Sequence, residues 1–135
     1  MSISFQFKEE ESPIFGKIKR PIAEVLFKQI HTDIWQPVTM LVDTGADYTL
    51  LPMFFAETLG VNFKKDCRTI KTQGVGRIST VYLLERPMQI QIGSMKRFIS
   101  LGFLNNNYIP PLLGRHKFFE TFKVVFDRHI VTFDS

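Results

Sequence analysis

Residues 43–47 of this 135-residue sequence, Asp-Thr-Gly-Ala-Asp, form the segment best suited to chemistry. They directly follow the apolar run VTMLV at 38–42, which predicts a buried strand. A carboxylate at the end of such a strand is costly unless it is hydrogen-bonded or has a chemical role. Gly45 permits a sharp turn, and the Thr44 hydroxyl can tie the loop. The four residues Asp-Thr-Gly-Ala alone are equally compatible with a simple turn that Asp43 caps.

Other motifs that mark catalytic or binding sites are absent. The sequence has no GxGxxG or Walker-type phosphate loop, no HExxH or CxxC metal motif and no GxSxG nucleophile. The Asp-x-Gly loop of sugar-kinase-like ATPases requires two large lobes, which 135 residues cannot supply. Cys67 lies among charged residues without a histidine beside it, so we expect a structural or exposed thiol. Surface or turn positions are expected for His31, His116 and His129.

Length and composition predict one globular domain over residues 1–135. Hydrophobic residues make up 44% and charged residues 22% of the chain, which excludes a disordered or fibrous protein. The single cysteine excludes an internal disulfide framework and an all-cysteine zinc site.

The net charge of +4 permits an acidic partner without requiring one. The basic residues are scattered and lack interleaved aromatic residues, so we expect a solvated surface and no binding of nucleic acid. The N-terminal residues do not resemble a secretory signal, and the longest charge-free run contains three asparagines and two prolines. We therefore expect a cytoplasmic protein without a membrane partner.

The pattern of apolar residues and turn signals predicts a mainly-β chain. Expected strands are 21–30 (for which a helix is the alternative), 38–42, 88–92 and 97–104. Hairpins are expected over 70–84, with its tip at 73–77, and at the C-terminus over 123–134. Short helical stretches are expected at 51–60 and 115–122. Residues 1–20 are predicted to form a loose arm or an added edge strand, and the core is expected over about 21–126.

Three of these features occur in the order typical of retropepsin-like aspartic proteases, and over about 21–126 the sequence resembles that family. They are the strand with Asp-Thr-Gly-Ala-Asp at 43–47, the glycine-tipped hairpin at 74–76, and Leu-Leu-Gly-Arg at 112–115. The resemblance implies a small closed β-barrel of the retropepsin type, with one or two short helices.

The resemblance also implies the reaction. Two carboxylates act on one water, one as general base and the other, protonated, as general acid toward the amide carbonyl. Asp43 is then the catalytic residue, in a loop with Thr44 and Gly45. Because the chain has one Asp-Thr-Gly, the second carboxylate must come from another molecule, and we expect a two-fold homodimer. No metal and no organic cofactor is implied.

In the family the threonine hydroxyl reaches the partner's loop, which implies that role for Thr44. The resemblance pairs Asp47 with Arg115, next to Gly114, as structural support for the loop. Tyr48 follows Asp47 as a bulky residue without an assigned role.

Substrate contacts follow from the same resemblance. Ala46 and Asp47 would line the groove with their backbone, and a flap carrying Gly74, Val75 and Gly76 would close over an extended peptide or protein substrate.

A catalytically silent dimerisation or peptide-binding module of the same fold is the alternative function. The chain is longer at both ends than minimal family members, which leaves open which terminal strands form the dimer interface. The phenylalanine-rich C-terminal region is equally compatible with core packing and with a partner surface.

Overall fold

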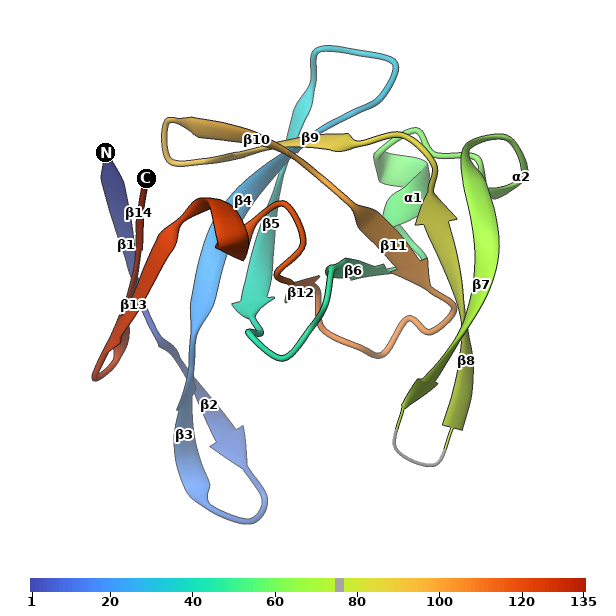
Figure 1. The fold of residues 1–135 in the computed structure, drawn as a ribbon. Helices are drawn as coiled ribbons and strands as arrows, with labels where there is room; N and C mark the ends of the chain where they lie inside the picture. Colours follow the sequence, from blue (N-terminus) through green and yellow to red (C-terminus); the bar gives the residue numbers. More distant parts are fainter. Residues whose placement is uncertain (75–76) are drawn as a thin grey trace.

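A computed structural model of the chain describes residues 1–74 and 77–135, which form fourteen strands, two short α-helices and one 3-10 turn (Figure 1). The strands are β1 (Ser2–Gln6), β2 (Lys8–Ser12), β3 (Gly16–Arg20), β4 (Ile22–Lys28), β5 (Trp35–Val42), β6 (Thr49–Pro52), β7 (Cys67–Gly74), β8 (Arg77–Leu84), β9 (Met88–Ile92), β10 (Met95–Ile99), β11 (Leu101–Leu104), β12 (Leu112–Leu113), β13 (Lys123–Asp127) and β14 (Ile130–Asp134). The helical elements are α1 (Phe55–Thr58), α2 (Phe63–Asp66) and η1 (Phe119–Thr121). No helix in this described part is long and apolar enough to cross a membrane.

One nine-stranded sheet, in the order β10-β9-β4-β5-β12-β6-β11-β8-β7, curls around the core (Figure 1). Two of its pairings are parallel, β12 with β5 and β11 with β6. The strands that precede and follow the loop at 43–48, β5 and β6, are linked through β12, which lies between them in the sheet. The predicted mainly-β fold is confirmed.

The strand predicted over 21–30 is β4, and its side chains alternate between core and surface. Ala23, Val25 and Phe27 are fully buried, whereas Glu24 between them is exposed. β4 pairs with β5 over its whole length and with β9 at Leu26 and Phe27, as an inner strand of the sheet does. The helical alternative is thereby excluded.

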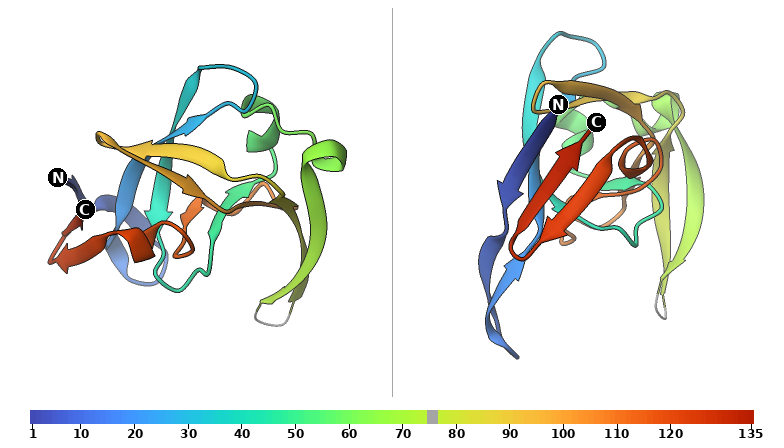
Figure 2. Two further views of the ribbon diagram at one scale, coloured as in Figure 1. Left: turned by 45° about the horizontal axis from the view of Figure 1, so that its top comes forward. Right: turned by 60° about the vertical axis from the view of Figure 1, so that its left-hand side comes forward.

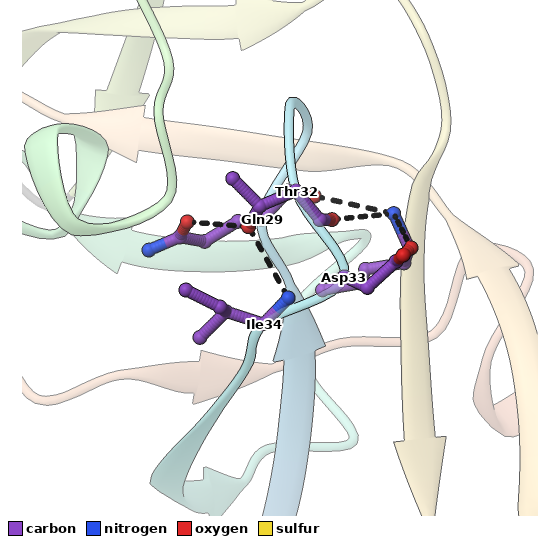
Figure 3. A network of polar contacts seen from close by, with 5 residues as sticks. Gln29, Thr32, Asp33 and Ile34 are labelled. Carbon is purple, nitrogen blue, oxygen red and sulfur yellow. Dashed lines mark hydrogen bonds and ion pairs between the residues drawn. The ribbon is translucent and has the colours of Figure 1, made fainter.

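Polar contacts within the loop at 29–34 fix the turn from β4 to β5 (Figure 3). The Thr32 hydroxyl donates to Gln29 Oε1 (2.7 Å), and the backbone N–H of Gln29 donates to Ile34 O (2.9 Å). Lys28 Nζ donates to Thr32 O (2.7 Å) and lies 3.7 Å from Asp33 Oδ1. A turn held in this way sets the register of β5, and hence the position of Asp43.

The chain termini form a separate three-stranded sheet, β1-β14-β13, seen at the side of the body in Figure 2. The predicted C-terminal hairpin is β13–β14, and residues 2–6 are the edge strand β1. Residues 8–20 form a second hairpin, β2–β3, which the sequence did not indicate.

Three predicted elements differ from the structure. The strand expected over 97–104 is divided at Ser100, because β10 lies at one end of the sheet while β11 pairs with β6 and β8. Leu51 and Pro52 end β6 instead of opening a helix, since Leu51 pairs with Phe103, and α1 begins at Phe55. The stretch 115–122 contains one 3-10 turn, η1, and α2 and β12 were not expected.

Most of the C-terminal phenylalanines belong to the core. Phe118 and Phe133 are fully buried with their ring centroids 5.7 Å apart, and Phe119 is 8% exposed. Phe126, in contrast, is 44% exposed. Phe118, Phe119 and Phe133 are therefore core residues, whereas Phe126 is exposed on the surface.

We expect Phe133→Ala to lower the free energy of unfolding by about 3–5 kcal/mol, because it empties a fully buried aromatic site. Phe126→Ala is the matched control and should change it by about 0.5 kcal/mol or less. Urea denaturation followed by circular dichroism measures both. Equal destabilisation by the two variants would contradict the packing described for β14.

Candidate active site

Asp43 follows the last residue of β5 and is held in place by neighbouring segments of the chain. Its backbone N–H donates to Leu113 O (3.1 Å), and the N–H of Val42 donates to Pro21 O (2.9 Å). Both contacts come from the strands or strand ends that flank β5. The position of the Asp43 carboxylate is therefore set by the sheet and not by the loop alone.

The Asp43 side chain also closes the turn that follows it. Its Oδ1 accepts a hydrogen bond from the Gly45 N–H (3.0 Å), and its carbonyl oxygen accepts one from the Ala46 N–H (3.1 Å). A Cβ on Gly45 would lie 3.3 Å from Asp43 Oδ1, so glycine suits this close approach. Asp43 is half-buried, and Thr44 and Gly45 are exposed beside it. An oriented, solvent-accessible carboxylate of this kind can exchange a proton with a bound water.

The loop after Asp43 is fastened to residues 115 and 116 mainly through its backbone. Ala46 O accepts from the Arg115 N–H (3.0 Å), and Asp47 O accepts from the His116 N–H (2.8 Å). The Arg115 guanidinium donates to Asp47 Oδ1 at 2.6 Å, which is the pairing that the family resemblance implies. Because both side chains are largely exposed, this ion pair contributes less to stability than the buried contacts around it.

Gly114 allows the backbone of residues 113–115 to touch the loop. A Cβ at this position would lie 2.3 Å from both the carbonyl carbon and the oxygen of Tyr48, a distance that no side chain tolerates. The Gly114 N–H donates to Oγ1 of the fully buried Thr49 (3.2 Å). Gly114 is therefore held against this loop by a close steric contact with Tyr48 and by a hydrogen bond to Thr49.

Tyr48, for which the sequence suggested no role, packs on the far side of this contact. A Cβ on Gly102 of β11 would lie 2.9 Å from its Cε2, so the tyrosine ring covers that glycine. Burial, with a smaller effect of the Asp47 carboxylate, raises the pKa of the Tyr48 hydroxyl. The roles of Tyr48, Thr49 and Gly102 escaped the sequence analysis because they depend on contacts between distant segments.

A groove of about 490 Å³ runs along the outer face of β5. Thr39 and Leu41 of β5 line it, and Asp43 follows two residues after Leu41, just beyond the end of the strand. Ile22 and Pro111 add apolar surface from the neighbouring segments. The remaining lining residues are Lys8, Glu10, Arg20 and Pro110.

The predicted hairpin over 70–84 is formed by β7 and β8, whose last described pair is Gly74 with Arg77. Figure 1 shows the two strands projecting from the body on the side where the β5–β6 loop lies. Val75 and Gly76, which were predicted to contact substrate, lie outside the described residues. In the described part of the chain, no three His, Cys, Asp or Glu side chains gather as metal ligands.

The family model for a gag-polyprotein putative aspartyl protease matches residues 35–118. Among solved structures, a retropepsin-like aspartic protease from Rickettsia conorii is 17% identical, with 98% of each chain covered and a TM-score of 0.68. EIAV protease in complex with an inhibitor is 23% identical, covers 77% of this chain and 86% of its own, and has a TM-score of 0.51. No curated protein sequence matches the chain. The predicted retropepsin fold is thereby confirmed.

Gly114→Ala is expected to lower the free energy of unfolding by about 3 kcal/mol or more, because the new methyl group would overlap the Tyr48 carbonyl. Arg115→Ala, which removes the exposed ion pair at the next residue, should cost about 1 kcal/mol or less. Urea denaturation of both variants tests this order. An unchanged midpoint for Gly114→Ala would show that the two backbones are not in contact.

Burial, followed by the Asp66 and Glu85 carboxylates, raises the pKa of the Cys67 thiol to about 11. Because the thiolate is the nucleophile, alkylation by iodoacetamide should be slow at neutral pH and rise about tenfold per pH unit up to about pH 10. Mass spectrometry of the alkylated chain measures the rate, with the urea-unfolded chain as control. A folded-state rate that levels off near pH 8.5, as for an ordinary thiol, would contradict the raised pKa.

Proposed function

Since this chain belongs to the gag-polyprotein putative aspartyl protease family, we propose that it is an aspartic endopeptidase that acts as a two-fold homodimer. The observation that carries the proposal is the Asp43 carboxylate. It is half-buried directly after β5, it is oriented by the Gly45 N–H, and it follows the strand that lines the groove.

The chemistry requires a second carboxylate, which the two-fold partner supplies as its own Asp43. Two carboxylates that lie close together share one proton, because the two negative charges would repel each other if both were ionised. The ionised one takes a proton from a water molecule, whose oxygen attacks the peptide carbonyl carbon, while the protonated one donates to the carbonyl oxygen. Collapse of the resulting tetrahedral species breaks the C–N bond. The carboxyl group that took the proton from water then donates it to the leaving amine.

The neighbouring residues fit this arrangement. The Thr44 hydroxyl is exposed one residue from Asp43, so it can reach the partner's loop at the two-fold axis. Because the contacts of Gly114 and Arg115 hold the loop, little reorganisation is required when two copies meet.

An extended peptide fits between the loop at 43–48 and the β7–β8 hairpin. The backbone of Ala46 and Asp47 would border the peptide on one side, and Gly74, Val75 and Gly76 on the other. Leu41 and its apolar neighbours in the groove beside Asp43 suit a hydrophobic substrate side chain. Main-chain hydrogen bonds then supply affinity, and the groove supplies selectivity.

We expect wild-type protein to cleave members of a mixed peptide library at some pH between acid and neutral, and Asp43→Asn to reduce the rate by about 10²–10⁴-fold or more. Glu57→Gln is the matched control, because it makes the same carboxylate-to-amide change at an exposed position of α1. Mass spectrometry identifies the new peptide termini, and sedimentation and thermal melting verify that each variant is folded.

Wild-type rates from Asp43→Asn would refute the proposed mechanism. A folded dimer that cuts no peptide at any pH would instead support a silent peptide-binding or dimerisation module.

A further inference from the structure

The β2–β3 hairpin projects from the body of the molecule, and at its base Lys8, Glu10 and Arg20 border the groove along β5. It forms a two-stranded sheet of its own, and neither strand pairs with another strand of the described residues. Figures 1 and 2 show it projecting on the side of the β5–β6 loop, and further out than that loop. We call residues 8–20 the ribbon.

One end of the ribbon is bonded to the terminal sheet, and the other is bonded to β5 just before Asp43. The Phe7 N–H donates to His129 O (2.8 Å) in the β13–β14 turn, and Pro21 O accepts from the N–H of Val42 (2.9 Å), the residue before Asp43. An ion pair of 2.8 Å between Arg20 Nε and Glu10 Oε2 joins the two strands near their base. The ribbon is therefore anchored at one end by β5, which also carries Asp43, and at the other end by the terminal sheet.

The tip of the ribbon is apolar and exposed. Ile14 and Phe15 are each 79% accessible, and the Ser12 hydroxyl accepts hydrogen bonds from both of their N–H groups (3.2 Å each). Gly16, at φ 71°, completes the turn. Large apolar side chains held out on an ordered turn indicate a binding surface, because a two-stranded ribbon is marginally stable without further packing.

The charges of the ribbon restrict how it can meet another protein. Glu9 and Glu11 lie opposite Lys19 and Lys17, so one face is covered by paired charges. If two copies joined edge to edge through β2 about a two-fold axis, acidic residues would face acidic residues, which disfavours that pairing. The opposite face carries Lys8, Glu10 and Arg20, which line the groove along β5, so the apolar tip is the part left available for contact.

We propose that the ribbon clasps a second copy of this chain, with Ile14 and Phe15 packed on the partner's body. The inference rests on the proposed function, since a shared dyad brings the partner's loop against the loop that carries Asp43. Because the ribbon extends past that loop on the same side, it must pass alongside any copy placed there. The site and the clasp then use one continuous interface.

Ile14→Ser combined with Phe15→Ser tests the clasp without disturbing the core, since both side chains are exposed. We expect the dimer dissociation constant, measured by sedimentation equilibrium, to rise at least about tenfold. Ile34→Ser is the matched control, because Ile34 is 57% exposed in the β4–β5 loop at the opposite end of the molecule, and it should leave the constant unchanged. An unchanged constant in the ribbon variant would overturn the proposal.

A photo-crosslinking phenylalanine analogue at position 15 locates the contact directly. Mixing isotope-labelled and unlabelled copies distinguishes crosslinks between copies from those within one copy. We expect crosslinks between labelled and unlabelled copies, on the partner surface around its candidate active site. Crosslinks confined to single copies would show that the ribbon folds onto its own chain, and would overturn the clasp.

The same samples separate this inference from the proposed function. A ribbon-dependent dimer that cuts no peptide supports the clasp and refutes the protease. A wild type that cleaves peptides, with a ribbon variant that dimerises equally well, refutes the clasp alone. A wild type that remains monomeric and inactive over the whole concentration range refutes both.

Discussion

The close contact between the backbones of Gly114 and Tyr48 is the constraint on which the candidate active site depends. It brings two segments together at a distance that only glycine permits, and the buried Thr49 hydroxyl satisfies the N–H that this contact would otherwise leave without a partner. The hydrogen bonds from residues 115 and 116 to the loop follow from the same approach. The exposed ion pair of Asp47 and Arg115 is a consequence of this geometry more than its cause.

The pairing of β12 with both β5 and β6 explains why the acidic loop lies where it does. β5 ends and β6 begins beside β12, so the residues between them are held at both ends. A carboxylate at such a point is rigid in position yet open to solvent on one side. A carboxylate held in this way suits the proposed site, in which a second copy supplies the other acid.

Local sequence patterns were sufficient to predict strands with one buried and one more exposed face, such as β4 and β9. In these strands buried positions alternate with more exposed ones over a few residues. Local patterns were also sufficient to predict that a loop begins at Asp43, because Asp-Thr-Gly is unusual directly after an apolar run. They failed at Leu51-Pro52, where parallel pairing with β11 overrides the helix-start signal. The packing of Tyr48 on Gly102 and Gly114 could not be predicted, because it depends on segments that are distant along the chain.

The pairing of β1 with β14 has a consequence for how the chain folds. Ser4 and Thr132, whose hydroxyls lie 2.7 Å apart, are separated by 128 positions in the sequence. The first strand therefore has no partner until nearly the whole chain has been synthesised. Closing so long a loop lowers the chain entropy before any contact can compensate for the loss. The terminal sheet is expected to be the last part to assemble and the first to open, so the lifetime of the folded state is governed at the seam between the two ends.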